Sequence, residues 1–235
     1  LNDKDFDYTI ILDADNVMEP DFLSKVNSVV DENKKVIQAH RTAKNKNTQY
    51  AILDALSEEI NNHIFRKGHR AIGFSSALIG SAMAFDYSLF KEKISKIETS
   101  GEDKELEFML LKEGYKFEYL DDAVVLDEKT QKSDVFVKQR SRWLANQFLQ
   151  ARLHFISSFI ALFKGKFDFF DKSLQHFLLP RILLLGTSFI LAIVSLLFFK
   201  HLLYYWLIIL TTILFSLIIA VPKRFFNFRT FIAIL

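Results

Sequence analysis

The order of hydrophobic and polar positions divides the chain into two parts. Up to about residue 155, short apolar runs alternate with charged and polar stretches. From about residue 176 to residue 221, Leu, Ile, Phe and Val form an almost unbroken run. The first pattern predicts an α/β domain, and the second predicts membrane helices.

Short strands and amphipathic helices follow one another in the first part. The expected strands are β-branched or apolar runs bounded by polar residues, at residues 8–12, 36–40 and, as one or two strands, 115–126. The expected helices have apolar positions every three or four residues, at residues 22–30, 45–65 and 104–113. Pro20 suits the start of the first helix, and Gly114 suits the end of the last.

The second part is long enough for two membrane spans, which we expect at about residues 177–199 and 202–221. Residues 144–175 mix Leu, Phe and Ile with polar side chains, so we expect an amphipathic region in the membrane interface, with a break at Lys164-Gly165-Lys166. Lys and Arg flank the pair of spans on one side, which places both flanks in the cytoplasm by the positive-inside rule. A buried hairpin of a soluble protein is the alternative.

Composition excludes several classes of protein. The 235 residues hold 30 Lys plus Arg and 28 Asp plus Glu, a formal charge of +2, so nucleic acid is not an expected partner. The absence of Cys excludes disulfides and thiolate zinc sites. Because the chain opens almost directly on a strand and ends in an apolar run, we expect both ends to be cut from a longer protein.

Two acids follow the first expected strand directly, at Asp13 and Asp15. Ligands of open α/β sheets bind where loops leave the carboxyl ends of strands. Two carboxylates on such a turn can hold Mg²⁺ or Mn²⁺, which prefer oxygen ligands, and the metal can carry a pyrophosphate. The alternative is that both acids only end a strand and solvate a turn.

Two segments in the middle of the chain have more than one interpretation. Residues 66–70 are basic with one glycine, and we expect a solvated loop, with phosphate contact as the alternative. Residues 74–85, which include Gly80 and Ser81, are rich in small side chains that let a ligand or another backbone approach closely. They suit the floor of a substrate pocket or a close-packed pair of strands.

Asp103 stands at the start of the helix expected at residues 104–113, where an N-cap is its default role. A carboxylate at such a turn, facing the same crevice as Asp15, is also placed to act as a general base on an acceptor hydroxyl. Further on, Gln139, Arg142 and Trp143 share one face of a helix, offering an amide, a forked donor for phosphate and a flat surface for a sugar. An ordinary basic amphipathic helix is the alternative.

Taken in order, the Asp13-Ala14-Asp15, Gly80-Ser81, Gly101-Glu102-Asp103 and Gln139-Arg140-Ser141-Arg142-Trp143 segments before two spans resemble the family 2 glycosyltransferases. The likeness is to membrane-bound members of the cellulose-synthase and hyaluronan-synthase types. It implies the C-terminal part of a GT-A, Rossmann-like α/β catalytic domain at residues 1–143. The amphipathic region at 144–175 and a transmembrane region at 176–235 would follow it.

The resemblance also implies roles for individual residues. Asp15 corresponds to the ligand of a divalent cation, Mg²⁺ or Mn²⁺, and Asp103 to the catalytic base. The implied nucleotide-sugar-binding residues are Asp13, Asp15, Gly80 and Ser81. The implied residues for acceptor and diphosphate are Glu102, Gln139, Arg142 and Trp143. Gly101 departs from the Thr of many members, and the strand and acid that bind the nucleobase are expected upstream of Leu1.

The implied activity is inverting transfer from a cytosolic nucleotide sugar, with a UDP-sugar as the expected donor. The acceptor is a growing polysaccharide or, alternatively, a lipid-linked saccharide that receives a single sugar. The implied location is the cytoplasmic (inner) membrane, multi-pass, with the catalytic domain facing the cytosol and the lipid bilayer as a partner. A non-catalytic membrane scaffold with a transferase fold is the alternative of another class.

Overall fold

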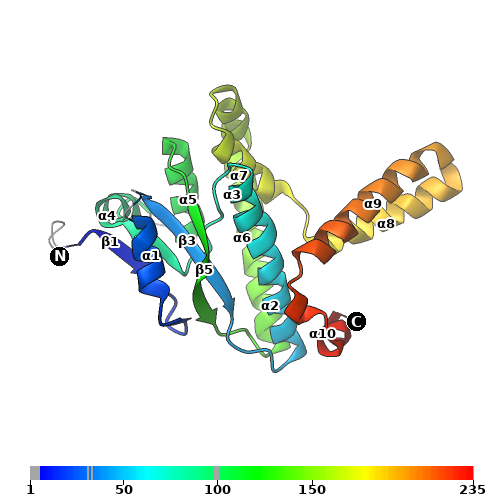
Figure 1. Cartoon of the computed structure of the whole chain (residues 1–235). Helices are drawn as coiled ribbons and strands as arrows, with labels where there is room; N and C mark the ends of the chain where they lie inside the picture. Colours follow the sequence, from blue (N-terminus) through cyan, green and yellow to red (C-terminus); the bar gives the residue numbers. More distant parts are fainter. Residues whose placement is uncertain (1–5, 31, 33, 98–100, 235) are drawn as a thin grey trace.

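Figure 1 shows a computed structural model of the chain, which describes residues 6–30, 32, 34–97 and 101–234. Five strands form one mixed sheet in the order β1-β4-β3-β5-β2. Their bounds are β1 Tyr8–Ile11, β2 Val17–Met18, β3 Val36–Ala43, β4 Met83–Asp86 and β5 Glu118–Asp127. The expected strands are therefore confirmed, the third of them as a single strand of ten residues.

The directions of the strands decide which chain segments meet. β3 and β5 run parallel, while β4 runs antiparallel to both β1 and β3, so β1, β3 and β5 all point the same way. Their carboxyl ends lie at one edge of the sheet, and β4 begins at that edge. The turn after β1, the loop before β4 and the end of β5 are thereby brought together.

The sheet has a hydrophobic core on each face, and neighbouring side chains of a strand enter different cores because they point to opposite sides. In β4, Met83 and Phe85 enter one core and Ala84 enters the other. Helix α1, Phe22–Val30, covers the Ala84 side through Phe22 and Val26. The other side is covered by α4, Tyr87–Ile94, and α5, Glu102–Glu113, with α5 contributing Leu106 and Phe108.

The basic segment at residues 66–70 is helical, so the prediction of a solvated loop was wrong. Helix α2, Gln49–Asn61, continues as a wider π-helix, η2 Asn62–Gly68, and then as α3 His69–Ala71. Arg66 is buried there. A Cβ atom on Gly68 would come within 2.9 Å of the His63 carbonyl oxygen. The glycine permits close packing of a helical turn and does not mark a chain break.

Helix α5 begins two residues earlier than a cap at Asp103 requires. Gly101 is the N-cap residue and has no side chain to accept a backbone hydrogen, while Asp103 lies within the first helical turn. The expectation of Asp103 as N-cap was therefore wrong, and its carboxylate is not used for capping. Gly114 ends the helix in a left-handed conformation, as expected.

From Ser133 onward, most of the described residues are helical. The bounds are α6 Ser133–Phe163, α7 Phe167–Phe177, α8 Arg181–Phe198, α9 Lys200–Ala220, η3 Lys223–Phe225 and α10 Phe228–Ile234. Helix α6 runs without a break across residues 143 and 144, where we expected the catalytic domain to end. It stops before Lys164-Gly165-Lys166, and α7 packs back against it.

Helices α8 and α9 form a hairpin that projects away from the sheet (Figure 1). Among the described residues, these are the two helices with the length and apolar composition of membrane spans, with mean hydropathies of 2.3 and 2.4. Helix α8 starts at Arg181, later than the expected residue 177. Phe177 ends α7, and Pro180, which cannot donate a backbone hydrogen, stands at the new start.

Candidate active site

Three carboxylates meet at the edge of the sheet where β1 and β5 end. One oxygen from each of Asp13, Asp15 and Asp127 lies within 4.8 Å of the other two. Asp13 and Asp15 follow β1, and Asp127 is the last residue of β5. Because β1 and β5 point the same way, residues more than 110 positions apart share this edge. We call these three residues the acidic cluster.

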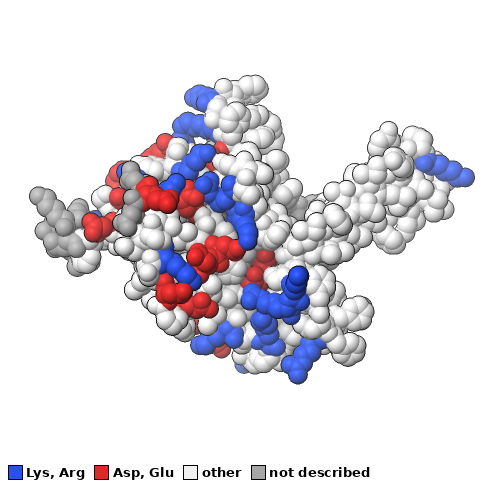
Figure 2. Space-filling view, in the orientation of Figure 1, with Lys and Arg blue, Asp and Glu red and all other residues white. Residues whose placement is uncertain are grey.

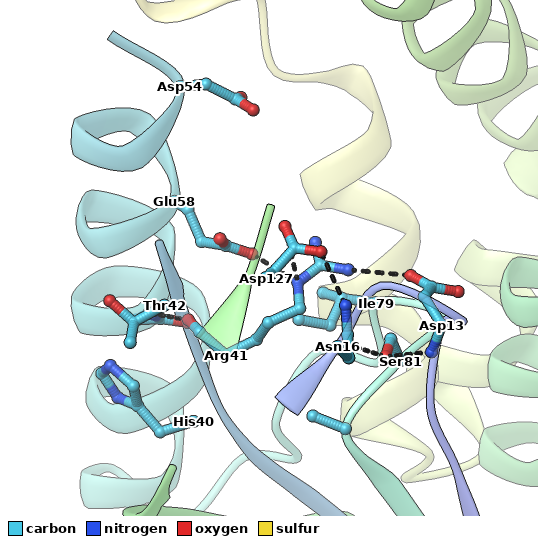
Figure 3. A network of polar contacts seen from close by, with 12 residues as sticks. Asp13, Asn16, His40, Arg41, Thr42, Asp54, Glu58, Ile79, Ser81 and Asp127 are labelled. Carbon is cyan, nitrogen blue, oxygen red and sulfur yellow. Dashed lines mark hydrogen bonds and ion pairs between the residues drawn. The ribbon is translucent and has the colours of Figure 1, made fainter. Parts of the chain in front are cut away.

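Asn16 and Ser81 connect the acidic cluster to the loop before β4 (Figure 3). The Asn16 side-chain amide donates hydrogen bonds to Asp127 Oδ1 at 2.8 Å and to Asp15 Oδ1 at 3.0 Å. The Ser81 hydroxyl donates to Asn16 Oδ1 at 2.5 Å and accepts from the Asp13 backbone N–H at 3.0 Å. Ser81 thus holds the turn that carries the acids. This contact gives Ser81 a structural role in addition to its predicted role in binding the nucleotide sugar.

Basic side chains frame the cluster on the side of α2. Arg41 Nε donates to Glu58 Oε1 at 2.8 Å, and its guanidinium approaches Asp13 to 3.6 Å (Figure 3). Lys129 pairs with Asp127 Oδ2 at 2.5 Å and also with Glu58. Burial alone would raise the pKa of Glu58, but the charges of Arg41 and Lys129 outweigh it and lower the pKa to about 2. Glu58 therefore stays ionised and holds both cations in place.

The electrostatics of Asp13 show that its neighbours are acidic. Partial burial is the largest cause of a raised pKa at Asp13, and Arg41 acts in the opposite direction. The charges of Asp127, Asp15 and Asp103 each raise this pKa further. Mutual repulsion among carboxylates is what a bound cation relieves.

The acidic cluster fits a hard divalent cation. Three carboxylates are the ligands that Mg²⁺ and Mn²⁺ prefer, and metal–oxygen bonds of about 2.1 Å place opposite ligands roughly 4 Å apart. The spacing of at most 4.8 Å lies close to that span. Asp13 and Asp15 are exposed and open to an ion, whereas Asp127 is buried and already oriented by Asn16 and Lys129.

Asp103 joins this site through Gly80. A Cβ atom on Gly80 would lie 3.7 Å from Asp103 Oδ2 and 3.8 Å from Asp103 Cβ, so the loop before β4 packs directly against the first turn of α5. Gly80 has φ = +83°, a conformation that suits glycine and turns the chain toward Ser81. The structure therefore brings together Asp13, Asp15, Gly80, Ser81 and Asp103.

Helix α6 contacts the first turn of α5 at its N-cap residue, Gly101. A Cβ atom on Gly101 would come within 3.1 Å of Asn146 Nδ2. Asn146 lies on the helix face of Gln139 and Trp143, which are seven and three residues earlier. The Gln139 Oε1 atom is buried and has no hydrogen-bond partner among the described residues. Trp143 is 41% exposed.

Two predicted residues are not held in the site by any described contact. Arg142 and Glu102 are exposed and make no hydrogen bond or ion pair within the described residues.

Arg140, which sequence reasoning did not single out, is held firmly. It donates to Asp54 of α2 at 2.5 Å, and its guanidinium lies 5.0 Å from the Trp143 ring centre and 5.1 Å from that of Phe136. Arg140 thereby fixes α6 against α2.

The sequence of the chain matches a known protein family. A family model described as "Glycosyl transferase family group 2" matches residues 8–226, which run from β1 to the residue after η3. The chain belongs to this glycosyltransferase family. The match covers far more than half of the chain and includes every residue of the site. A search of curated proteins finds no match to the chain.

As a family 2 glycosyltransferase, the chain is an enzyme that takes a nucleotide-sugar donor and an acceptor. Members of the family generally use divalent cations, which agrees with the acidic cluster. The mixed α/β sheet is consistent with a GT-A domain.

Sequence reasoning missed Asp127 and Asn16. The sequence did contain a signal for Asp127, because this acid ends a strand. Asp13 has a similar position, two residues after the end of β1. Its nearness to Asp13 depended on the strand order, which the local pattern does not contain.

Proposed function

We propose that this glycosyltransferase is a membrane-bound inverting enzyme that adds sugars from a cytosolic nucleotide sugar to a growing polysaccharide. One observation carries the proposal most directly: Asp103 packs against Gly80 beside the acidic cluster and acts electrostatically on Asp13. A diphosphate bound at Asp13, Asp15 and Asp127 would thus have a carboxylate within reach of the sugar it carries.

Asp103 is the proposed base. It is half-buried, and it is free of the capping role that would tie up its oxygens. In the proposed step, the acceptor hydroxyl loses its proton to Asp103 as its oxygen attacks the anomeric carbon. The bond from that carbon to the diphosphate oxygen breaks, and the nucleoside diphosphate leaves. A single displacement of this kind inverts the configuration and needs no covalent enzyme intermediate.

The leaving diphosphate requires positive charge and hydrogen-bond donors. A divalent cation held by Asp13, Asp15 and Asp127 supplies a Lewis acid for its oxygens when bound. Arg142 is an exposed guanidinium on α6, and we propose that it closes over the diphosphate, with Gln139 and Trp143 receiving the acceptor sugar. The buried Gln139 Oε1, unpartnered among the described residues, supports a ligand at this face.

The hairpin supports a membrane location. Of the most apolar window of α8, 17% is buried inside the protein, and of that of α9, none is. Figure 2 shows charged side chains over the domain built on the sheet and almost none along the hairpin, apart from its far end. An uncovered apolar surface of this length suits the hydrocarbon of a bilayer. We place the catalytic domain on the cytosolic side of the inner membrane, because Lys223 and Arg224 flank the base of the hairpin.

Transfer of a single sugar to a lipid-linked acceptor remains the second candidate, and the sequence motif with Trp143 favours the polymer. Product size separates the two. A ladder of lengths identifies a synthase, whereas one added sugar in the lipid fraction identifies a lipid glycosyltransferase.

The test is release of nucleoside diphosphate by membranes that contain the full-length protein. A panel of UDP- and GDP-sugars is supplied with and without Mg²⁺ or Mn²⁺. We expect metal-dependent release from one donor, with a UDP-sugar as the expected one. Asp103→Asn should lower turnover by about 10²- to 10⁴-fold while donor binding is kept, since only the proton acceptor is lost.

Asp134→Asn serves as the matched control, because Asp134 is an exposed acid in the first turn of α6. It should release diphosphate at the wild-type rate. Turnover by Asp103→Asn at the same rate as this control would remove Asp103 from the role of base. No release from any donor by inserted, folded protein would contradict the proposed activity.

A further inference from the structure

A second concave site lies away from the acidic cluster. A cavity of about 380 Å³ opens between β3, β5, the α2–η2 helix and the end of α9. Asp121, one of its lining residues, precedes Asp127 by six positions on β5, which corresponds to roughly 20 Å of extended strand. The proposed transfer reaction uses none of the lining residues.

The polar wall of the cavity carries balanced charges. Arg224 pairs with Glu59 at 2.5 Å, and Lys67 pairs with Asp121 at 2.5 Å. His40 lies between the two acids, with Nε2 3.5 Å from Glu59 and Nδ1 3.2 Å from Asp121. Two cations therefore stand beside two carboxylates in one hollow. A ligand that suits it has no net charge but carries separate positive and negative groups.

Both cations remain accessible to a ligand. The side chains of Lys67 and Arg224 are 57% and 48% exposed, and that of Asp121 is 45% exposed. The Lys67–Asp121 pair is exposed on both sides, and such pairs contribute about 0–1 kcal/mol, so a bound ligand can replace it at little cost. Glu59, by contrast, is only 5% exposed and also accepts a hydrogen bond from Thr42.

The opposite wall is apolar and belongs to the base of the second span. It consists of Ile219, Ala220, Val221 and Pro222 at the end of α9. Lys223 and Arg224 follow directly, so this wall stands at the level where the proposed membrane span meets the cytoplasm. A ligand in the cavity would have its polar part against the sheet domain and its apolar part along α9, which is the shape of a lipid.

We propose that this cavity binds the headgroup of a zwitterionic phospholipid with a primary ammonium group, as in phosphatidylethanolamine. The lipid phosphate pairs with Lys67 and Arg224, and its ammonium donates hydrogen bonds to Glu59 and Asp121. A quaternary ammonium has no N–H to donate, and an anionic headgroup leaves both carboxylates without a partner. The proposal rests on the membrane location proposed above, and it is independent of the transfer chemistry.

The experiment measures lipid retention by native mass spectrometry. The full chain is purified in neutral detergent, stripped of lipid and incubated with equal amounts of dioleoyl phosphatidylethanolamine, phosphatidylcholine and phosphatidylglycerol. Wild type is expected to retain phosphatidylethanolamine in preference to the other two. Arg224→Gln should weaken that binding about tenfold, because it removes one of the two cations.

Lys223→Gln is the matched control, since it makes the same change of charge one residue earlier and does not line the cavity. It should bind like wild type. Lys67→Gln provides a second test at a side chain that is 57% exposed, and it should also weaken binding about tenfold.

Equal retention of the three lipids, or a preference for phosphatidylglycerol, would overturn the assignment of a zwitterionic headgroup. So would unchanged binding in both Arg224→Gln and Lys67→Gln. Because retention is measured without substrate, an inactive enzyme that still binds phosphatidylethanolamine would contradict the proposed reaction and leave this site standing.

Discussion

Gly101 and Asn146 lie so close that a Cβ atom on residue 101 would come within 3.1 Å of Nδ2 and 3.3 Å of Oδ1 of the asparagine. This contact joins the first turn of α5, which carries Asp103, to the α6 face that carries Gln139 and Trp143. The absence of a side chain at residue 101 is therefore what lets the proposed base and the proposed acceptor face approach each other.

We expect Gly101→Thr to push α6 away from Asp103 and to lower kcat about 10- to 100-fold, because a displacement of about 1 Å at a reacting centre has effects of this size. Asn146→Gly removes the clashing amide. The double variant should recover most of the lost turnover, as measured by diphosphate release. If Gly101→Thr costs as much turnover in the Asn146→Gly background as in wild type, the contact does not position the site.

Asp127 is predicted to hold the divalent cation together with Asp13 and Asp15. Asp127→Asn keeps the size of the side chain but removes one of three negative charges. The concentration of Mg²⁺ or Mn²⁺ that gives half-maximal activity should therefore rise at least about tenfold. A titration of activity against metal concentration measures this. Asp122→Asn changes an exposed acid on the same strand and should leave the titration unchanged. Identical curves for both variants would exclude Asp127 as a ligand.

A substitution at Gly80 tests whether the loop before β4 positions the acidic cluster. Gly80→Ala places a side chain at φ = +83°, which costs about 1–2 kcal/mol, and shifts the loop that carries Ser81. Turnover should fall, because Ser81 accepts from the Asp13 backbone and bonds to Asn16.

Gly73→Ala controls for backbone strain. Gly73 has φ = +89°, and an added Cβ would meet nothing within 4 Å. This variant should lose a similar amount of stability and keep its activity. If both alanine variants keep wild-type turnover after correction for the folded fraction, the Gly80 turn does not set the site.

We expect acidic pH to destabilise the packing of α7 through protonation of His176. Burial lowers the pKa of His176 to about 4, and the charge of Lys104 acts in the same direction, whereas an unfolded histidine titrates near 6.5. The unfolded state then binds the proton first as pH falls. The contribution of neutral His176 to the free energy of unfolding is complete above about pH 6.5 and is lost between pH 6.5 and 4. Between pH 7.5 and 5 this contribution falls by about 2 kcal/mol.

Denaturant unfolding of the detergent-solubilised chain at pH 7.5 and 5 measures this loss. His176→Gln should unfold with a smaller difference between the two pH values than wild type. His201→Gln, exposed at the far end of the hairpin, should retain the wild-type difference. A wild-type difference that persists in His176→Gln would assign the acid sensitivity to other groups.

Local periodicity in the sequence was enough to predict several parts of this protein. The apolar run before Asp13, the helix after Pro20, the stop at Gly114 and the two long apolar helices all follow from side-chain spacing and turn chemistry over a few residues. The same holds for the placement of Asp13 and Asp15 at a strand end. These features require no knowledge of what lies beside each element.

Which of these elements meet depends on the tertiary structure. Asp127 joins Asp13 because β1, β3 and β5 point the same way, and that order depends on contacts between segments more than 40 residues apart. Residues 66–70 were expected as a loop but form a helix in which Arg66 is buried. The sequence alone marks Gly101 only as a departure from Thr, whereas in the structure it is the point where helix α6 packs against α5. Local spacing carries no record of such neighbours, because they are selected by packing over the whole domain.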